Sequence, residues 1–325
     1  MSEILQKHDN VRLIEGHVEY QCMNGTWKRE IWDDSYQEIY ETLTKEFAPT
    51  NKLDERTFSK AFLNHQYRCQ IVNSLKGWEI NIRRMRTQPP TFHELNIDNE
   101  GPLSLVTEPG LTLFAGPINS GKSSTLSAAI NALGVQRLGR TALFEDPAEY
   151  IYTFPFFTQR EIGINVGSFE DGVRQSARGN FNTIIVQEIR DIETAKAVIT
   201  ASIRGVRVLA TIHAGSVVDA IAAMYNFVGA EYGRLLPQAI RGVFCQRLIY
   251  FPRKDKAPLP IYESLSIDKQ VQVIMQEGVS CLHRIGGEMI RQDRRSMKEQ
   301  GLRYIERGTC SEQDIEGTLG NSLRR

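Results

Sequence analysis

The sequence lacks several features that mark proteins of membranes, of the cell exterior or of long nucleic acids. Its 325 residues contain no apolar run of the roughly 18–20 residues needed to cross a bilayer. The opening segment, MSEILQKHDN, has no apolar core of the kind found in secretion signals. Acidic and basic residues balance at 39 each, whereas proteins that hold long nucleic acids usually carry a basic excess. We therefore expect a cytoplasmic protein without direct nucleic-acid binding.

Paired cysteines are also missing. The five cysteines are an odd number, lie far apart and form no CxxC pair, so we expect free thiols in a reducing compartment rather than a disulfide framework or a zinc site (Cys22, Cys69, Cys245, Cys281 and Cys310). With 41% hydrophobic and 24% charged residues, the composition is that of an ordinary globular protein. The length suits two domains.

The first part of the chain predicts a small α+β domain. The stretch EYQCMNGTWKREIW is typical of a hairpin, with Asn24-Gly25 suited to a tight turn. YRCQIV and WEINIRRM indicate two further strands. Between the two pairs, apolar residues recur at helical spacing and predict one amphipathic helix (Tyr36, Ile39, Tyr40, Leu43 and Phe47).

A proline-containing segment, TQPPTFHELNIDNEGP, predicts the linker to a second domain, because adjacent prolines continue neither a helix nor a central strand. We place the N-terminal domain, with the linker at its end, at residues 1–97 and the second domain at residues 98–325.

The second domain alternates strands and helices, which predicts an α/β fold with a parallel sheet. LTLFA, TALF, NTIIV and VRVLATI are short apolar runs typical of buried parallel strands, and IETAKAVITASI is a helix between two of them. The helix after Gly121 is expected to bury one apolar face and to end near Gly134 (Leu126, Ala129, Ile130 and Leu133). After about Pro252 we expect turns followed by helices with a solvated charged face.

The segment AGPINSGKSS matches the phosphate-binding pattern G-x-x-x-x-G-K-[ST] and lies between a predicted strand and a predicted helix. In such a loop, backbone N–H groups and the helix N-terminus converge on phosphate oxygens. Lys122 would reach the β- and γ-phosphates of ATP, and Ser123 would bind Mg²⁺. The predicted nucleotide contacts comprise seven residues of this loop (Gly116, Asn119, Ser120, Gly121, Lys122, Ser123 and Ser124).

Three polar residues follow other strands of the predicted sheet. Glu145 follows TALF, Glu188 follows NTIIV, and His213 follows VRVLATI. In an open α/β sheet, ligands bind beyond the carboxyl ends of the strands, so all three are expected beside the phosphate loop. Glu188 would hold Mg²⁺ together with Ser123, and Glu145 would polarise the attacking water. For His213 two roles stay open: sensing the γ-phosphate or linking neighbouring strands.

These segments together resemble a known family, the type II/IV secretion and type IV pilus ATPases of the PilT/GspE class. GPINSGKSS is similar to its Walker A loop, FEDPAEY to its Asp box, IIVQEIRDIET to its Walker B and LATIHAGS to its His box. FEDGVRQSAR and AIRGVFCQRL fit as well. The resemblance covers roughly residues 60 to 310 well. The short chain is similar to PilT-like members, and YRCQIVNSLKGWEINIRRMRTQPP looks closest to DotB-like members.

The resemblance implies a homo-hexameric ring of subunits with a PAS-like N-terminal domain and a RecA-like P-loop domain. It implies ATP hydrolysis that powers a DotB-like type IV secretion or conjugative transfer system, with PilT-like pilus retraction as the alternative. It also implies peripheral docking on platform or coupling proteins of an inner membrane. Family members supply arginines from the N-terminal domain, and the matching strands here carry Arg68, Arg83 and Arg84.

The chain departs from the family pattern at five places. Gln187 replaces a glycine before the Walker B glutamate, and Asn73 replaces an arginine of the N-terminal strands. The other three departures are Gly205-Val206 for Gly-His, His213-Ala214-Gly215 for His-Thr-Asn, and Phe181-Asn182 for Asp-Pro. The tetracysteine module of larger members is absent from the sequence. These differences count against retraction by the usual PilT arrangement.

Two other classes of protein share a phosphate loop. A small-molecule kinase would need an arginine-rich lid and an acceptor pocket, neither of which the sequence indicates. A scaffold that binds nucleotide without hydrolysing it would not need the carboxylates at Glu145 and Glu188. Both alternatives are separated from an ATPase by measuring phosphate release.

Overall fold

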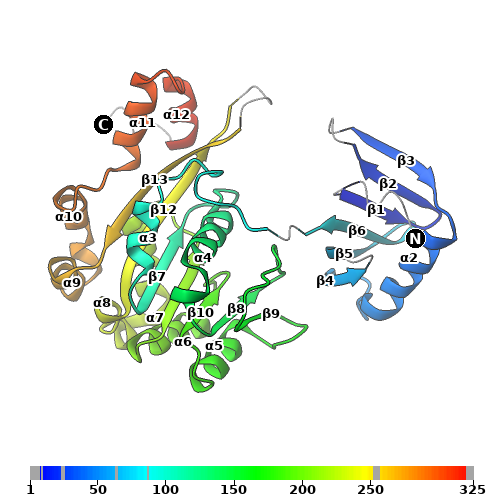
Figure 1. The fold of residues 1–325 in the computed structure, drawn as a ribbon, viewed down its shortest axis with the longest axis horizontal. Coiled ribbons are helices and arrows are strands. Elements are labelled where there is room, and N and C mark those ends of the chain that lie inside the picture. Colours follow the sequence, from blue (N-terminus) through cyan, green and yellow to red (C-terminus); the bar gives the residue numbers. More distant parts are fainter. Residues whose placement is uncertain are drawn as a thin grey trace. The chain divides into compact units, whose positions relative to one another are not determined.

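The computed structural model describes residues 8, 10–22, 26–62, 65–85, 88–251 and 257–319. It divides into two compact units, whose elements are labelled in Figure 1. Unit 1 comprises Met1–Gln88 with Glu145–Tyr152 and Arg160–Asn165, and unit 2 comprises the remaining residues. The predicted turn at Asn24-Gly25 lies outside the described residues. The predicted boundary between the N-terminal domain and the second domain, after residue 97, stays a prediction.

Unit 1 contains a six-stranded sheet in the order β3-β2-β1-β6-β5-β4, and each neighbouring pair is antiparallel. The predicted hairpin, helix and paired strands are all present. The elements are β1 (Asn10–Ile14), β2 (His17–Gln21), β3 (Trp27–Ile31), α2 (Asp34–Phe47), β4 (Arg56–Phe62), β5 (His65–Ser74) and β6 (Gly77–Arg84).

Helix α2 covers one face of this sheet. Asp33 caps the helix by accepting hydrogen bonds from the N–H groups of Ser35 and Tyr36. The predicted apolar face is turned inward, and the rings of Phe47 and Phe58 stack with centroids 3.8 Å apart. Alternate residues of the strands complete the core, as expected for a sheet with one covered face.

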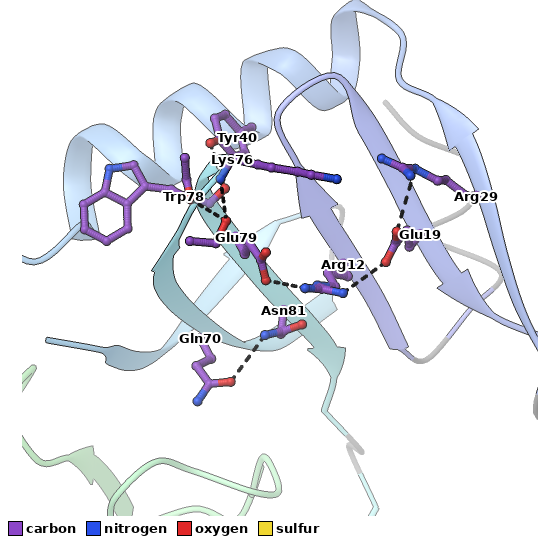
Figure 2. Close-up of polar contacts among 11 residues, drawn as sticks. Arg12, Glu19, Arg29, Tyr40, Gln70, Lys76, Trp78, Glu79 and Asn81 are labelled. Atoms are coloured by element: carbon purple, nitrogen blue, oxygen red, sulfur yellow. Dashed lines mark hydrogen bonds and ion pairs between the residues drawn. The ribbon is translucent and has the colours of Figure 1, made fainter. Parts of the chain in front are cut away.

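The other face of the same sheet is polar and carries a row of alternating charges (Figure 2). Arg12 on β1 contacts Glu79 on β6 and, at 3.3 Å, Glu19 on β2. Glu19 in turn lies 3.8 Å from Arg29 on β3. The hydrogen bond from Arg12 lowers the pKa of the Glu79 carboxyl. These cross-strand pairs link four neighbouring strands on the polar face.

Most of a seven-stranded sheet belongs to unit 2, and only Glu145, Arg160 and Glu161, at two strand ends, are counted with unit 1. The strand order is β13-β12-β7-β11-β10-β8-β9. The strands from β12 to β8 in this order run parallel, and β13 is antiparallel to β12. The strands are β7 (Gly110–Ala115), β8 (Thr141–Glu145), β9 (Phe157–Glu161), β10 (Thr183–Val186), β11 (Arg207–Ile212), β12 (Ile240–Ile249) and β13 (Leu259–Ser266).

All residues of β7, β8 and β10 are buried, because helices cover both faces of the parallel strands. Helices α4 and α6 both pack against β7 and β11. The helices are α3 (Glu100–Val106), α4 (Lys122–Leu138), α5 (Phe169–Arg178), α6 (Ile192–Ile203), α7 (Val217–Gly233), α8 (Leu236–Ala239), α9 (Lys269–Gln276), the 3₁₀ helix η1 (Val279–Arg284), α10 (Ile285–Arg291), α11 (Met297–Glu306) and α12 (Glu312–Leu319).

The order of the strands creates a switch point between β7 and β11. After β7 the chain passes to β8, three places away, and returns through β10 to β11 beside β7. From β11 it crosses to β12 on the far side of β7. Ligands of open α/β sheets bind at such a point, beyond the carboxyl ends of the strands. The phosphate loop follows β7, at this position.

Several local features differ from the sequence expectation, among them β1 and β4, where no strand was predicted. Gly134 has a positive φ of 56° and kinks α4 as predicted for a helix end, but a further helical turn continues to Leu138. Strand β9 was not predicted. Strand β13 replaces part of the expected turns after Pro252, because its apolar residues pair with β12 and extend the sheet. Helices α10, α11 and α12 then pack near β12 and β13 (Figure 1).

Among the described residues, no helix combines the length and the apolar character required to span a bilayer.

Candidate functional site

The backbone between β7 and α4 has the shape of a phosphate-binding loop. Gly116, Asn119 and Gly121 have positive φ angles of 156°, 60° and 84°. A Cβ atom on Gly116 would lie 2.3 Å from the Ser120 Oγ and 2.4 Å from the Gln246 carbonyl oxygen. Glycine is therefore required at this position, because any side chain would push the loop away from β12.

Lys122 begins α4 and is held inside the loop. Its side chain is buried, with 8% exposure. The Nζ donates a hydrogen bond to the Pro117 carbonyl at 2.8 Å and lies 3.3 Å from the Nδ1 of His213. The ammonium group thus lies at the mouth of the loop, where the phosphates of a nucleotide would bind.

His213 also contacts Glu188, at 2.9 Å between Nε2 and Oε1. A protonated Lys122 can only donate, so the Nδ1 of His213 accepts, and the ring proton lies on Nε2 and is donated to Glu188. The half-exposed His213 and the less exposed Glu188 follow β11 and β10, respectively. The structure therefore joins three predicted site residues in one chain of contacts at the carboxyl ends of adjacent parallel strands.

Glu145 ends β8, the strand next to β10. Phe144 pairs in register with Val186, two residues before Glu188. The Glu145 side chain is 5% exposed, and its Oε1 accepts a hydrogen bond from the Glu149 N–H at 3.4 Å. Burial at a strand end suits a positioned carboxylate, and its role toward water stays a prediction.

The first turn of α4 contains Ser123 and Ser124, both half-buried. With Glu188, Ser123 gives an all-oxygen donor set, which suits Mg²⁺ rather than a softer metal. Among the described residues, no group of three or more His, Cys, Asp and Glu side chains is placed to hold a metal ion. Mg²⁺ at such sites is usually held by one or two protein ligands, phosphate oxygens and water, so these residues fit it.

The thiols take no part in this site. All five cysteines are free. Burial raises the pKa of the Cys69 and Cys245 thiols, which disfavours the thiolate that nucleophilic or metal-binding cysteines need.

Gln246 is a site residue that sequence reasoning missed. It lies on β12, is 2% exposed, and its Nε2 donates to the Ser120 carbonyl at 2.6 Å. Its Oε1 accepts from the Thr125 hydroxyl at 2.5 Å. One buried amide thus ties the phosphate loop and α4 to the neighbouring strand. Only the pairing of β12 with β7 reveals this contact, because 121 residues separate Thr125 from Gln246.

The outer side of the loop borders a pocket of about 450 Å³. Tyr250, just after β12, donates its hydroxyl to the Asn119 carbonyl at 2.9 Å. Arg247 closes the pocket toward α12 by donating to the Thr318 carbonyl at 2.9 Å. The loop is therefore supported from β12 at two points, by Gln246 and Tyr250. Neither residue belongs to a recognisable nucleotide-binding pattern in the sequence.

We expect Gln246→Leu to destabilise the loop and weaken nucleotide binding. Leucine is close in size but leaves the Ser120 carbonyl and the Thr125 hydroxyl without their partner, at a cost of about 1–3 kcal/mol for each group left buried and unpaired. Denaturant unfolding and titration with a fluorescent ATP analogue measure both effects. The matched control is Gln270→Leu, at an exposed position in α9. Equal stability and equal affinity in the two variants would contradict the role given to Gln246.

Arg68, Arg83 and Arg84 lie in unit 1, on β5 and β6. Arg68 and Arg83 are direct cross-strand partners on the polar face of the sheet. Arg84 pairs with Tyr67 on the covered face, and its Nη2 lies 2.9 Å from the Nε2 of His65. The three arginines therefore lie on two different faces of the sheet, Arg68 and Arg83 on the polar face and Arg84 on the covered face. Among the described contacts, neither Arg68 nor Arg83 has a carboxylate partner, unlike Arg12 and Arg29.

Comparison with known proteins gives a family and a fold. A family model described as type II/IV secretion system protein matches residues 66–284. The chain is 28% identical over 221 residues to the uncharacterised protein YggR of Escherichia coli K12, covering 66% of this chain and 67% of YggR. It is 30% identical over 177 residues to the type IV pilus ATPase PilU of Pseudomonas aeruginosa, covering 53% of this chain but only 46% of PilU.

Two solved structures have a similar fold. The ATPase DotB of Legionella pneumophila superposes with a TM-score of 0.81 at 22% identity, covering 94% of this chain and 90% of DotB. The pilus retraction motor PilT with bound ADP also gives 0.81, at 21% identity, covering 96% of this chain and 93% of PilT. The expected fold class, a RecA-like α/β domain with a smaller N-terminal α+β domain, is confirmed.

Proposed function

Because the chain belongs to the family of type II/IV secretion system proteins, we propose that it is a motor ATPase that acts as a homo-hexameric ring on a secretion or pilus machine. The observation that carries this proposal is the chain of contacts from Lys122 through His213 to Glu188 on a formed phosphate loop. A site that only bound phosphate would not need a carboxylate linked to the loop lysine through an imidazole.

Each residue has a defined part in hydrolysis. Lys122 and the loop N–H groups bind the β- and γ-phosphates, and bound Mg²⁺, held by Ser123 and Glu188, would neutralise charge on them. Glu145 orients water for in-line attack. His213 contacts both Lys122 and Glu188. Loss of the γ-phosphate removes a ligand of Lys122 and of the Mg²⁺ held by Glu188, so the positions of both contacts of the imidazole change. This arrangement couples the nucleotide state to β10 and β11.

The remaining positive charge comes from unit 1 in this proposal. Two guanidinium groups directly opposite each other on a sheet repel, which favours an arrangement in which an anion lies between them. Arg68 and Arg83 form such a pair without a carboxylate among the described contacts. We assign them the contact with phosphate, whereas Arg84, on the other face beside His65, supports the sheet.

The ring follows if these arginines act on the nucleotide of a neighbouring subunit. Head-to-tail contacts between different patches close into rings, and charge compensation across a contact couples one site to the next. We expect rings mixed from Lys122→Ala and Arg83→Ala subunits to regain activity that neither variant has alone. In a random equal mixture, roughly a quarter of the sites combine an intact loop with an intact arginine.

The control mixture replaces Arg83→Ala by Arg84→Ala. If Arg84 only supports the sheet, this variant keeps activity by itself and shows no complementation with Lys122→Ala. Sedimentation with ATP measures the assembly. A monomer with full specific activity would contradict the ring, and absence of rescue in assembled mixed rings would contradict catalysis across subunits.

As for the machine, we propose a DotB-like secretion or conjugative transfer system, with the ring docked from the cytoplasm on proteins of the inner membrane and without direct contact to nucleic acid. The fold likeness to DotB and PilT is equal by TM-score, so the departures in the His box and before Walker B carry this preference. Pilus retraction is the alternative. Co-purification of the ring with a secretion-platform protein, rather than with a pilus platform, is the discriminating result.

A further inference from the structure

A second pocket lies at the opposite end of the parallel strands from the phosphate loop. It has a volume of about 530 Å³ and is lined by residues that precede β7, β10 and β11 and by the end of α4. Strand β11 separates it from His213 by six residues, or roughly 20 Å at the rise of a β-strand. The pocket is therefore separate from the nucleotide site, and its size falls in the range of small-molecule sites.

Among the described residues, the lining carries cationic groups and no carboxylate. Arg137, Arg204 and Arg207 contribute guanidinium groups, and Gln136 and Asn182 contribute amides. The chain as a whole is neutral, with 39 acidic and 39 basic residues. A pocket lined by three arginines and no acid is thus a local concentration of positive charge, which raises the local concentration of anions.

Arg207 is the fixed member of the group. It donates to the carbonyl of Arg137, in the last turn of α4, and to the carbonyl of Thr107, directly after α3. Its Nε is buried without a hydrogen-bond partner, and no carboxylate lies within ion-pair distance in the described part of the chain. Burial lowers the pKa of the Arg207 guanidinium, opposed in part by the more distant Glu108.

Arg137 and Arg204 both line the pocket and are exposed. Neither makes a side-chain hydrogen bond or ion pair among the described contacts, and each lies at a helix C-terminus. A favourable interaction with the helix dipole explains one arginine at such a position. It does not explain why two helix ends and Arg207 bring their cations to a single pocket.

Asn182 is oriented by its surroundings. Its Oδ1 accepts a hydrogen bond from the Arg140 N–H at 2.9 Å, so its amide N–H₂ group is left to donate elsewhere. Gly139, with φ of 63°, leaves the room for this amide, since a Cβ there would lie 2.7 Å from the Oδ1. The guanidinium carbon of Arg140 lies over the ring of Phe181, a lining residue, 4.3 Å from the ring centroid. Arg207 and Asn182 are thus held by contacts to the backbone, whereas Arg137 and Arg204 are exposed.

We propose that this pocket binds a phosphate monoester through Arg137, Arg204 and the Asn182 amide. Guanidinium forks and amide donors match the several oxygens of a dianionic phosphate, and a concave site of this size holds such a group better than it holds an extended acidic chain. The monoester belongs either to a soluble metabolite or to a lipid headgroup. The site does not depend on the proposed ATPase activity.

The test uses the full chain with its phosphate loop saturated by Mg²⁺·ADP, and glycerol 3-phosphate as the soluble probe. We expect calorimetric binding in the millimolar range or tighter, weakened at least tenfold by the double substitution Arg137→Glu, Arg204→Glu. The matched control is Arg234→Glu, Arg303→Glu, which changes charge equally at exposed ends of two other helices. The control is expected to bind like the parent protein.

A second arm distinguishes the source of the phosphate. Vesicles of phosphatidylcholine with phosphatidic acid, a phosphate monoester, are compared with vesicles that contain phosphatidylglycerol, a diester. Binding to the first vesicles that is lost in the double variant assigns a lipid headgroup, and binding of glycerol 3-phosphate alone assigns a soluble ligand. Equal affinity in the double variant and the control, or no binding of either probe, overturns the proposal. The proposal is also overturned if the double variant binds the probe normally but no longer assembles into a ring, because the pocket would then be a contact between copies of the chain.

Discussion

Lys122→Ala is expected to abolish ATP turnover while the protein stays folded. The substitution removes the cation from the mouth of the phosphate loop, together with its contacts to the Pro117 carbonyl and to His213. Glu188 then keeps its imidazole partner, but the link to the phosphates is gone. Because charge compensation at the transferred phosphate provides much of the rate enhancement, we expect a loss of several orders of magnitude in steady-state phosphate release.

The matched control is Lys269→Ala, at an exposed position in the first turn of α9. It is expected to hydrolyse ATP at the parent rate. Circular dichroism and denaturant unfolding establish that both variants are folded. Activity near the parent value in folded Lys122→Ala would contradict the assignment of the loop as the catalytic nucleotide site.

Glu188→Gln and Glu145→Gln are expected to bind ATP and to lose hydrolysis by orders of magnitude. Glutamine keeps the shape of each side chain, and the amide oxygen at position 188 can still accept the hydrogen bond from His213. What is lost is negative charge, and with it the hold on Mg²⁺ at Glu188 and the polarisation of water at Glu145. The binding constant and kcat therefore respond differently.

Titration with a fluorescent ATP analogue measures binding, and phosphate release measures turnover. Glu193→Gln, at an exposed position in the first turn of α6, is the charge-matched control. A turnover within about threefold of the parent in either test variant would remove that glutamate from the mechanism. For Glu145 this experiment is the more informative, because its contacts at the end of β8 do not by themselves define a role.

Much of the architecture could be predicted because its signals are local. Apolar periodicity located α2, the glycine pattern located the phosphate loop, and strand-end polar residues located Glu188 and His213. The carboxyl ends of parallel strands share one edge of the sheet, and the contacts among Lys122, His213 and Glu188 lie there.

What could not be predicted depends on residues brought together from distant parts of the chain. Gln246 supports the loop only because β12 lies beside β7. The division of the arginines between two faces of the N-terminal sheet depends on the register of β5 and β6. Strand β13 was missed because its pairing with β12, rather than its own alternation, determines its structure.

Steady-state phosphate release from the full chain with Mg²⁺·ATP, at concentrations where the protein is assembled, is the decisive measurement for a motor ATPase. We expect turnover that saturates with ATP, requires Mg²⁺ and is absent from Glu188→Gln protein that still binds the nucleotide. Tight ATP binding by the assembled parent protein without release of phosphate, or release that proceeds unchanged in Glu188→Gln, would contradict it.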